Sequence, residues 1–194
     1  MDIKEDSMKQ VTINNNVFIP MPMGIIGTQY NGKANFMAAG WISRANATPP
    51  MISAGIGRHH ATWQAINETG EFSVCIPGSD LLIKTDYAGI VTGEKIDKSG
   101  IFNVFYGTLS HAPLIEEAIV SLECTLVQSV DLPSNTVFIG EIQGAWADER
   151  YFDGKQIDFK SGSAFFLTMP DNIYWSFGEN IGKAWSIGKD FTPK

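Results

Sequence analysis

The sequence is poor in cysteine, in positive charge and in long apolar runs. Its only two cysteines, Cys75 and Cys124, lie in alternating apolar stretches and lack a CxxC partner. We therefore expect buried, reduced thiols and neither a disulfide nor a metal site. No apolar run approaches the roughly 18 residues that a membrane-spanning helix needs, so no membrane span is expected.

Positive charge is the scarcer sign. The chain holds 14 Lys and Arg against 21 Asp and Glu, which gives a formal net charge of −7 at pH 7, and no basic run occurs. Because binding to a phosphate backbone needs a basic surface, nucleic acid is not an expected partner. The polar segment 1–10 does not resemble a signal peptide, so the expected location is the cytoplasm.

Motifs of several common enzyme classes are also absent. The chain has no G-x-S-x-G elbow, no G-x-G-x-x-G turn and no Walker loop. Hydrolase, Rossmann and P-loop chemistry therefore lack their sequence markers. The composition that remains, 44% hydrophobic and 18% charged, is typical of a globular protein.

Short strands separated by turn signals dominate the pattern. Asn31-Gly32 is the strongest hairpin signal, because a type I′ turn needs positive φ, and it predicts that Met23–Tyr30 pairs with a strand over Lys33–Ser43. Two helices are expected, over Ala61–Thr69 with Gly70 as its stop and over Asp80–Ile90 with Asp80 as its cap. The other expected strands are 11–19 (a polar-interrupted strand or turn), 51–56, 72–76, 120–130 and 135–147.

This pattern predicts a mainly β fold, a barrel with short helical plugs. We expect a single domain over residues 1–194, with its core at about 20–168 and a C-terminal arm at 169–194. The arm is aromatic and glycine-rich, which is typical of a segment laid on the barrel or on a second subunit.

The stretch from Lys33 to Gly70 concentrates the candidate site residues. Small side chains at Ala38, Ala39 and Gly40 would let a ligand lie close to the backbone. A polar group at the expected start of the first helix would favour an anion, since free N–H groups and the helix dipole point there. This group consists of Arg58, His59, His60 and Thr62. Together the two features suit a phosphorylated aromatic cofactor.

A structural explanation of the same residues stays open, with Thr62 or a neighbour as a helix cap and Arg58 solvated. A metal site is not expected, because His59 and His60 are too close in sequence to clamp one ion and His111 is distant.

Several short motifs, in order and spacing, resemble the flavin reductase-like family, and within it flavoredoxin-type members. They span about residues 20–190, and one departure is Cys75, where many relatives would have Asn. The motifs are Asn35-x-Met37-x-x-x-Trp41, Pro49-Pro50, Arg58-x-x-x-Thr62, Gly70-Glu71-Phe72-x-Val74, Gly93-x-x-x-Asp97-Lys98, Pro113–Glu116, Leu122–Cys124, Ile139–Ile142 and Gly182–Lys189.

The resemblance implies an FMN-binding split β-barrel, Greek-key-like, with two or three short helices, in a protein that forms homodimers. In this interpretation Trp41 flanks the flavin ring, although a core position is equally open, and Ser43 meets the polar edge of the ring. Lys95 and Lys98 lie on a loop that can approach the cofactor, or are solvated charges. The implied FMN contacts are Asn35, Met37, Ala38, Ala39, Gly40, Trp41, Ile42, Ser43, Arg58, His59, His60, Thr62, Lys95 and Lys98.

The function implied by the resemblance is an FMN-dependent oxidoreductase that passes electrons from NAD(P)H or a redox carrier through bound FMN. The alternative is a non-catalytic electron carrier or flavin sensor without its own NAD(P)H site. A scaffold that has lost its cofactor is a more remote alternative. No titratable residue is obviously required for hydride transfer, and no nicotinamide fingerprint separates the first two possibilities.

Overall fold

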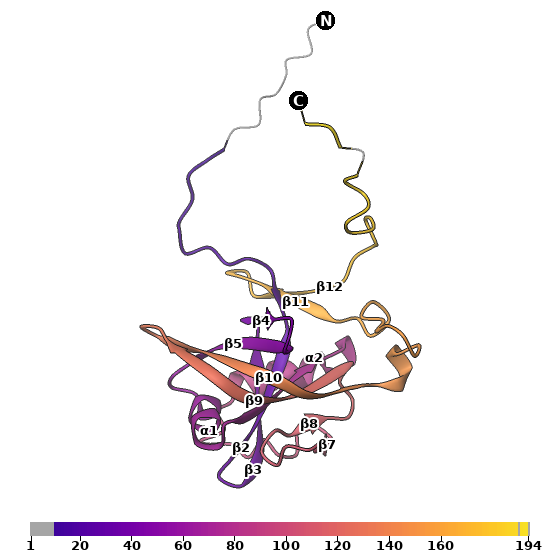
Figure 1. Cartoon of the computed structure of the whole chain (residues 1–194). Coiled ribbons are helices and arrows are strands. Elements are labelled where there is room, and N and C mark those ends of the chain that lie inside the picture. The colour runs from indigo at the N-terminus through magenta and orange to yellow at the C-terminus, as the bar shows by residue number, and fades with distance from the viewer. Residues whose placement is uncertain (1–9, 190, 194) are drawn as a thin grey trace, which may run out of the picture.

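A computed structural model describes residues 10–189 and 191–193 and has a mainly β architecture (Figure 1). One antiparallel sheet has seven strands in the spatial order β3-β2-β6-β9-β10-β5-β4. Its two edge strands, β3 and β4, follow each other in the chain, so the sheet is a barrel split between them. The seven strands are β2 (Gly24–Tyr30), β3 (Lys33–Ala39), β4 (Ile42–Asn46), β5 (Met51–Gly57), β6 (Glu71–Ile76), β9 (Val120–Asp131) and β10 (Asn135–Ala147).

The remaining elements are short. Two α-helices, α1 (Ala61–Thr69) and α2 (Leu82–Ile90), confirm the expectation of a mainly β fold with two or three short helices. No helix in the described part of the chain is long and apolar enough to cross a membrane. The other elements are β1 (Met21–Pro22), η1 (Ser79–Leu81), β7 (Val104–Phe105), β8 (Leu114–Ile115), η2 (Glu149–Tyr151), β11 (Phe165–Thr168) and β12 (Ile173–Ser176).

Local signals predict the first hairpin and the first helix correctly. Asn31 and Gly32 both have positive φ, 51° and 75°, and Tyr30 pairs with Lys33 across the turn. Helix α1 has the predicted bounds, and Gly70 ends it in the left-handed region with φ 68°, where its N–H donates to the carbonyl of Ile66.

The prediction of a single strand over Lys33–Ser43 is wrong. The chain breaks at Gly40-Trp41, because β3 pairs with β2 while β4 pairs with β5 at the other edge of the sheet. A Cβ at Gly40 would lie 3.0 Å from the Cβ of Met21, so the incoming N-terminal segment crosses this corner closely. The corner carries the chain across the split.

Two further expectations need correction. The second helix begins as the 3₁₀ turn η1, in which the N–H of Leu81 donates to the carbonyl of Gly78, and Asp80 makes no capping bond. Residues 10–20 pair with no sheet edge, so the strand alternative for 11–19 is wrong, and all of them except the half-buried Phe18 are exposed. The N–H of Asn16 donates to Oδ1 of Asn14 at 2.8 Å, which is the local bond of a turn.

Two apolar clusters hold the barrel and α2 together. The larger fills the barrel and includes Ile56, Phe72 and Phe138, while the second joins β2 and β3 to α2 around Phe36 and Phe102. Cys75 and Cys124 are buried free thiols, which confirms the expectation for both. Burial raises the pKa of each thiol, that of Cys124 to about 12.

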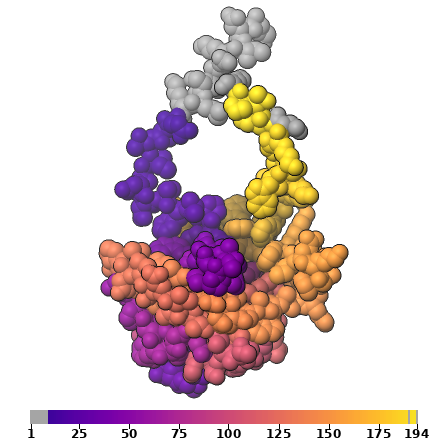
Figure 2. Space-filling model, viewed as in Figure 1, coloured from indigo at the N-terminus to yellow at the C-terminus, as the bar shows by residue number. Residues whose placement is uncertain are grey.

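The terminal segments project from one side of the barrel (Figure 2). Their large apolar side chains are exposed, with Trp185 at 95% and Ile181 at 94% of full exposure. Strand β12 pairs with β11, which in turn pairs with β1, and the Tyr174 hydroxyl donates to Asp86 of α2. The β11–β12 hairpin therefore ties residues 169–176 to the barrel, and an ion pair of 2.9 Å between Lys160 and Glu179 holds the next turn of chain.

Candidate functional site

The amino end of α1 carries a small buried polar cluster. The side-chain nitrogen of Asn35 donates to the hydroxyl of Thr28 at 3.2 Å and to the hydroxyl of Thr62 at 3.1 Å. All three side chains are buried. The N–H groups of Ala61 and Thr62 open the helix and have no acceptor within it. A buried hydroxyl and free backbone donors therefore meet at one point.

The loop between α2 and β7 borders this cluster. A Cβ placed on Gly93 would lie 2.2 Å from Oδ1 of Asn35 and 3.4 Å from the Cβ of Ala61, so the loop backbone touches both β3 and α1. Oδ1 of Asn35 is itself buried and has no hydrogen-bond partner among the described residues.

Lys98, on the same loop, is a buried cation, 5% exposed. Its ammonium group donates to the carbonyls of Phe36 at 2.9 Å and Ala88 at 2.8 Å. No carboxylate of the described residues pairs with it, and burial lowers the pKa of Lys98 to about 8. This uncompensated positive charge favours an anion nearby.

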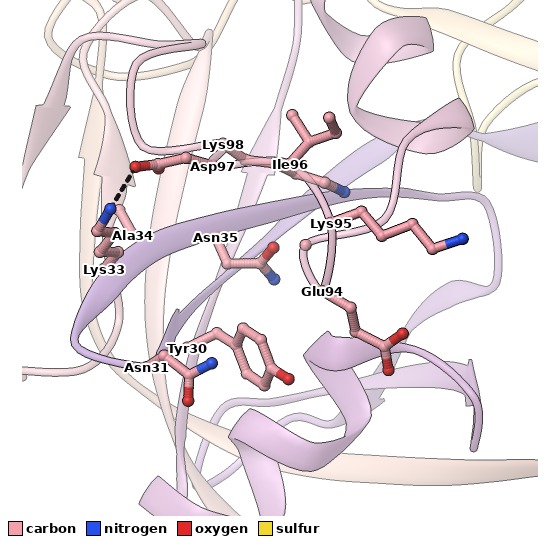
Figure 3. A pocket seen from close by; sticks show the side chains of 11 residues that line it. Tyr30, Asn31, Lys33, Ala34, Asn35, Glu94, Lys95, Ile96, Asp97 and Lys98 are labelled. Carbon is pink, nitrogen blue, oxygen red and sulfur yellow. Dashed lines mark hydrogen bonds and ion pairs between the residues drawn. The ribbon is translucent and has the colours of Figure 1, made fainter.

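Asn35, Gly93 and Lys98 line a cavity of about 220 Å³ between the β2–β3 hairpin and the loop (Figure 3). Asn35 points into the space between them, and Lys33 bridges to Asp97 at 2.6 Å at one side. The structure thus brings Asn35 close to Lys95 and Lys98, which lie far from it in the sequence. The lining residues are Tyr30, Asn31, Lys33, Ala34, Asn35 and 93–98.

Two adjacent histidines, His59 and His60, lie beside the start of α1. Their rings lie 4.0 Å apart, and a Cβ on Gly57 would touch both. The pKa of His60 is lowered, first by burial and then by the charges of His59 and Lys98, while Glu94 opposes the shift. His60 therefore faces the loop as well as the start of α1.

Arg58 points elsewhere. Its guanidinium donates to the carbonyl of Leu132 at 2.8 Å and lies 3.5 Å from a carboxylate oxygen of Asp131, in the β9–β10 turn. The structure therefore does not bring the Arg58 side chain to the Asn35–Thr62 cluster.

Trp41 marks the other end of the candidate site. It is 49% exposed, which rules out the alternative of a core aromatic. Its ring stacks on Phe18 with centroids 6.4 Å apart and lies over Gly55, where an added Cβ would be 3.3 Å from the indole. A cavity of about 620 Å³ opens beside it, between residues 17–22 and 40–43.

The other residues expected from the β3–β4 stretch divide between core and surface. Met37 and Ile42 pack against the barrel core, and Ala39 is buried in it. Ala38 contacts α2, where a Cβ on Gly89 would lie 3.1 Å away. Ser43 is exposed on edge strand β4, and its carbonyl accepts from the hydroxyl of Ser53 at 3.2 Å.

The sequence did not predict that one face of β5 connects the start of α1 with Trp41. On β5, Ile52, Ala54 and Ile56 point into the core, so Ser53, Gly55 and Gly57 share the opposite face. Trp41 lies over Gly55, and the histidines lie against Gly57. The flat surface of small residues thus belongs to β5 more than to Ala38–Gly40. The alternation of apolar with small residues over 52–57 was the available signal.

Comparison with known proteins gives a consistent result. The model of the flavin reductase like domain matches residues 17–162. The crystal structure of flavoredoxin from Methanosarcina acetivorans superposes with a TM-score of 0.91 at 48% identity, over 94% of this chain and 98% of that one. Flavoredoxin of Desulfovibrio vulgaris (Miyazaki F) gives a TM-score of 0.84 at 28% identity, over 94% and 100%.

A sequence relative with a named activity is more distant. The NADH-dependent flavin reductase of a Rhodococcus species is 27% identical over 128 residues, which cover 66% of this chain and 66% of that protein. The structural matches confirm the split β-barrel expected from the sequence.

Proposed function

The chain belongs to the flavin reductase-like domain family, as a flavoredoxin-type member, and on that premise we propose that it binds FMN and passes electrons through it. The observation that carries this proposal is the donor cluster at the start of α1, joined by the small-residue face of β5 to the exposed Trp41. One end suits a phosphate and the other suits a flat ring.

The residues present fit FMN in three respects. The free N–H groups of α1 and the Thr62 hydroxyl are donors at a helix amino end, which is where phosphates bind. Lys98 supplies a buried positive charge without a carboxylate partner among the described residues. The Ser53–Gly57 face itself carries only small side chains, and a ring would enter beside Trp41, which lies over Gly55. His59 and His60 lie against Gly57, where this face meets the start of α1.

The protein would bind and orient the cofactor, while the flavin supplies the redox chemistry, accepting a hydride or electrons and passing them on. Edge strand β4 pairs only with β5 in the sheet, so its outer N–H groups are free to meet the polar edge of a ring, as proposed for Ser43. These N–H groups favour negative charge on a bound ring. Trp41 would cover the ring and limit its contact with water.

Two electron-transfer roles remain candidates. The first is a reductase-type oxidoreductase that takes electrons from NAD(P)H, in line with the activity named for the Rhodococcus relative. The second is an electron carrier without its own NAD(P)H site, favoured because the two solved relatives reported above, at 48% and 28% identity, are named flavoredoxin. Both roles use the same cofactor and site.

We also propose that the functional unit is a homodimer. The exposed apolar residues of the C-terminal arm, such as Trp175, Ile181 and Trp185, form more uncovered apolar surface than a monomer usually leaves in water. A two-fold interface that covers this surface should bury more than about 1,000 Å².

The visible spectrum tests the proposal. Protein purified with added FMN should keep a yellow chromophore through gel filtration, and mass spectrometry should identify it as FMN. Bleaching by NADH or NADPH without oxygen would favour the reductase, while bleaching only by a chemical or protein reductant would favour the carrier. Colourless protein that releases all FMN would refute flavin binding and leave a scaffold without a cofactor.

A further inference from the structure

We propose that Asn35 is a positioning residue, which fixes the Thr62 hydroxyl as a hydrogen-bond donor toward the phosphate and does not itself contact the flavin. This inference rests on the proposed function and assigns a specific role within it. It also changes the role implied for Asn35 by the sequence resemblance, from a cofactor contact to a residue that acts through Thr62.

The hydrogen-bond directions in the buried cluster carry the argument. A side-chain amide nitrogen is a donor only, and both of its hydrogens are used, one on Thr28 and one on Thr62. The Thr62 oxygen therefore accepts from Asn35. Its own hydrogen has no acceptor among the described residues, so it is available to a ligand.

Gly93 explains why the amide keeps this orientation. In the opposite orientation the amide nitrogen would take the place beside Gly93 where the buried Oδ1 has no hydrogen-bond partner among the described residues. As it stands, only Oδ1 of the amide is unpaired, and it faces the position that a Cβ on residue 93 would occupy, which glycine leaves open. An unpaired buried acceptor is tolerated better than unpaired buried N–H groups.

The consequence is a site that contains donors only. A phosphate accepts hydrogen bonds and cannot donate when fully ionised, so every protein group around it should donate. The free N–H groups of Ala61 and Thr62 donate by nature, but a hydroxyl can do either. Asn35 removes this ambiguity at Thr62, and Gly93 keeps Asn35 in place.

A double-mutant cycle tests this role. Asn35→Leu keeps about the same side-chain volume and adds no charge beside the phosphate, but it removes the donor that orients the Thr62 hydroxyl. Thr62→Val removes the hydroxyl. We expect each variant to lower FMN affinity by at least about tenfold. The double variant should be no weaker than the worse single variant within about twofold, because both changes remove one interaction.

Riboflavin, which lacks the phosphate, is the control ligand, and its affinity should change by less than about threefold in every variant. Equal losses for FMN and riboflavin would show that Asn35 only maintains the fold, and additive losses in the double variant would show that it acts independently of Thr62. Either result overturns the inference. Wild-type protein that binds FMN and riboflavin equally would instead refute the phosphate site of the proposed function.

A second variant disturbs the amide from its other side. Gly93→Ala would place a Cβ 2.2 Å from Oδ1 of Asn35 and turn the amide away from Thr62. FMN affinity should fall by about tenfold with riboflavin affinity retained. Gly100→Ala, close by in the chain with nothing within 4 Å of the added Cβ, is the matched control. If Gly93→Ala and Gly100→Ala behave alike, Gly93 does not hold Asn35.

Discussion

The two ends of the candidate site differ in how far one chain completes them. At the start of α1, Asn35, Thr62 and Lys98 are each at least nine-tenths buried and held by hydrogen bonds to several elements. At the other end, Trp41 is half exposed and touches Phe18, in the N-terminal segment that leaves the barrel. The site is therefore buried and hydrogen-bonded at the start of α1 and open to solvent at Trp41.

In the proposed function, this difference separates recognition of the phosphate from recognition of the ring. A phosphate needs donors fixed before it arrives, and the sheet and helix α1 can supply them within one chain. A ring needs a broad apolar cover, which the exposed terminal segments can supply only by folding back or by lying on a second subunit. Changes at the two ends should therefore fail in different ways.

The largest effect should come from removing the C-terminal arm. We expect a chain that ends at residue 168 to be monomeric or aggregated and to bind FMN weakly, because the cover of the open end and the subunit contact are lost together. Sedimentation and flavin titration on the same sample measure both. A chain that ends at residue 177 keeps β12 and the Tyr174–Asp86 bond, and separates loss of the tail from loss of the hairpin. Full-length protein that sediments as a monomer with FMN fully bound would contradict the dimer proposal.

Blocking the wall at the ring end should weaken both flavins equally. In Gly55→Val the new side chain would start 3.3 Å from the Trp41 indole and occupy the surface proposed for the ring. We expect FMN and riboflavin affinities to fall together by roughly tenfold or more, since both ligands carry the same ring. Fluorescence titration with each flavin measures this. A loss confined to FMN would mean that the wall does not hold the ring.

The sequence predicts the local parts of this site better than the long-range parts. The hairpin at Asn31-Gly32 and helix α1 follow from turn and capping chemistry within a few residues, and both are found where expected. The break at Gly40 was missed because it depends on which strands β3 and β4 pair with, at opposite edges of one sheet. Such pairing leaves no mark within a short window of sequence.

The direction in which a side chain points is the second feature that the sequence does not predict. A charged residue beside a helix start looks like a phosphate ligand in sequence, but Arg58 reaches a turn 74 positions away in the chain. Thr62 and Asn35, in contrast, form a hydrogen bond across 27 positions that no short stretch of sequence predicts. The contact with Leu132 in the β9–β10 turn decides where Arg58 points.

Substitutions of Thr62 and of Arg58 should therefore differ in their effect on FMN affinity. Thr62→Val should lower FMN affinity by about tenfold or more and spare riboflavin, because it removes one donor to the phosphate. Arg58→Ala should change FMN affinity by less than about threefold, because its partners are Asp131 and Leu132. Titration of both variants with both flavins measures the contrast. A larger FMN loss in Arg58→Ala would mean that the arginine turns toward the ligand.

The smallest effect should be a pH dependence from Lys98. The folded-state pKa of Lys98 is about 8, below the ordinary value of 10.5. Between these two pH values the unfolded chain binds more protons than the folded chain, so the free energy of unfolding increases as the pH rises. A nearby bound phosphate would raise this pKa, so FMN affinity should fall by roughly threefold between pH 7 and 9. Lys98→Met should abolish the dependence. An unchanged profile in that variant would assign the pH effect to another group.

Titration of the apoprotein with FMN and with riboflavin under identical conditions tests the proposed phosphate site at the start of α1. The two ligands share the ring and the ribityl chain and differ only in the phosphate. A preorganised site with several charge-assisted donors should bind FMN at least about a hundredfold more tightly than riboflavin. Equal affinities would contradict the account.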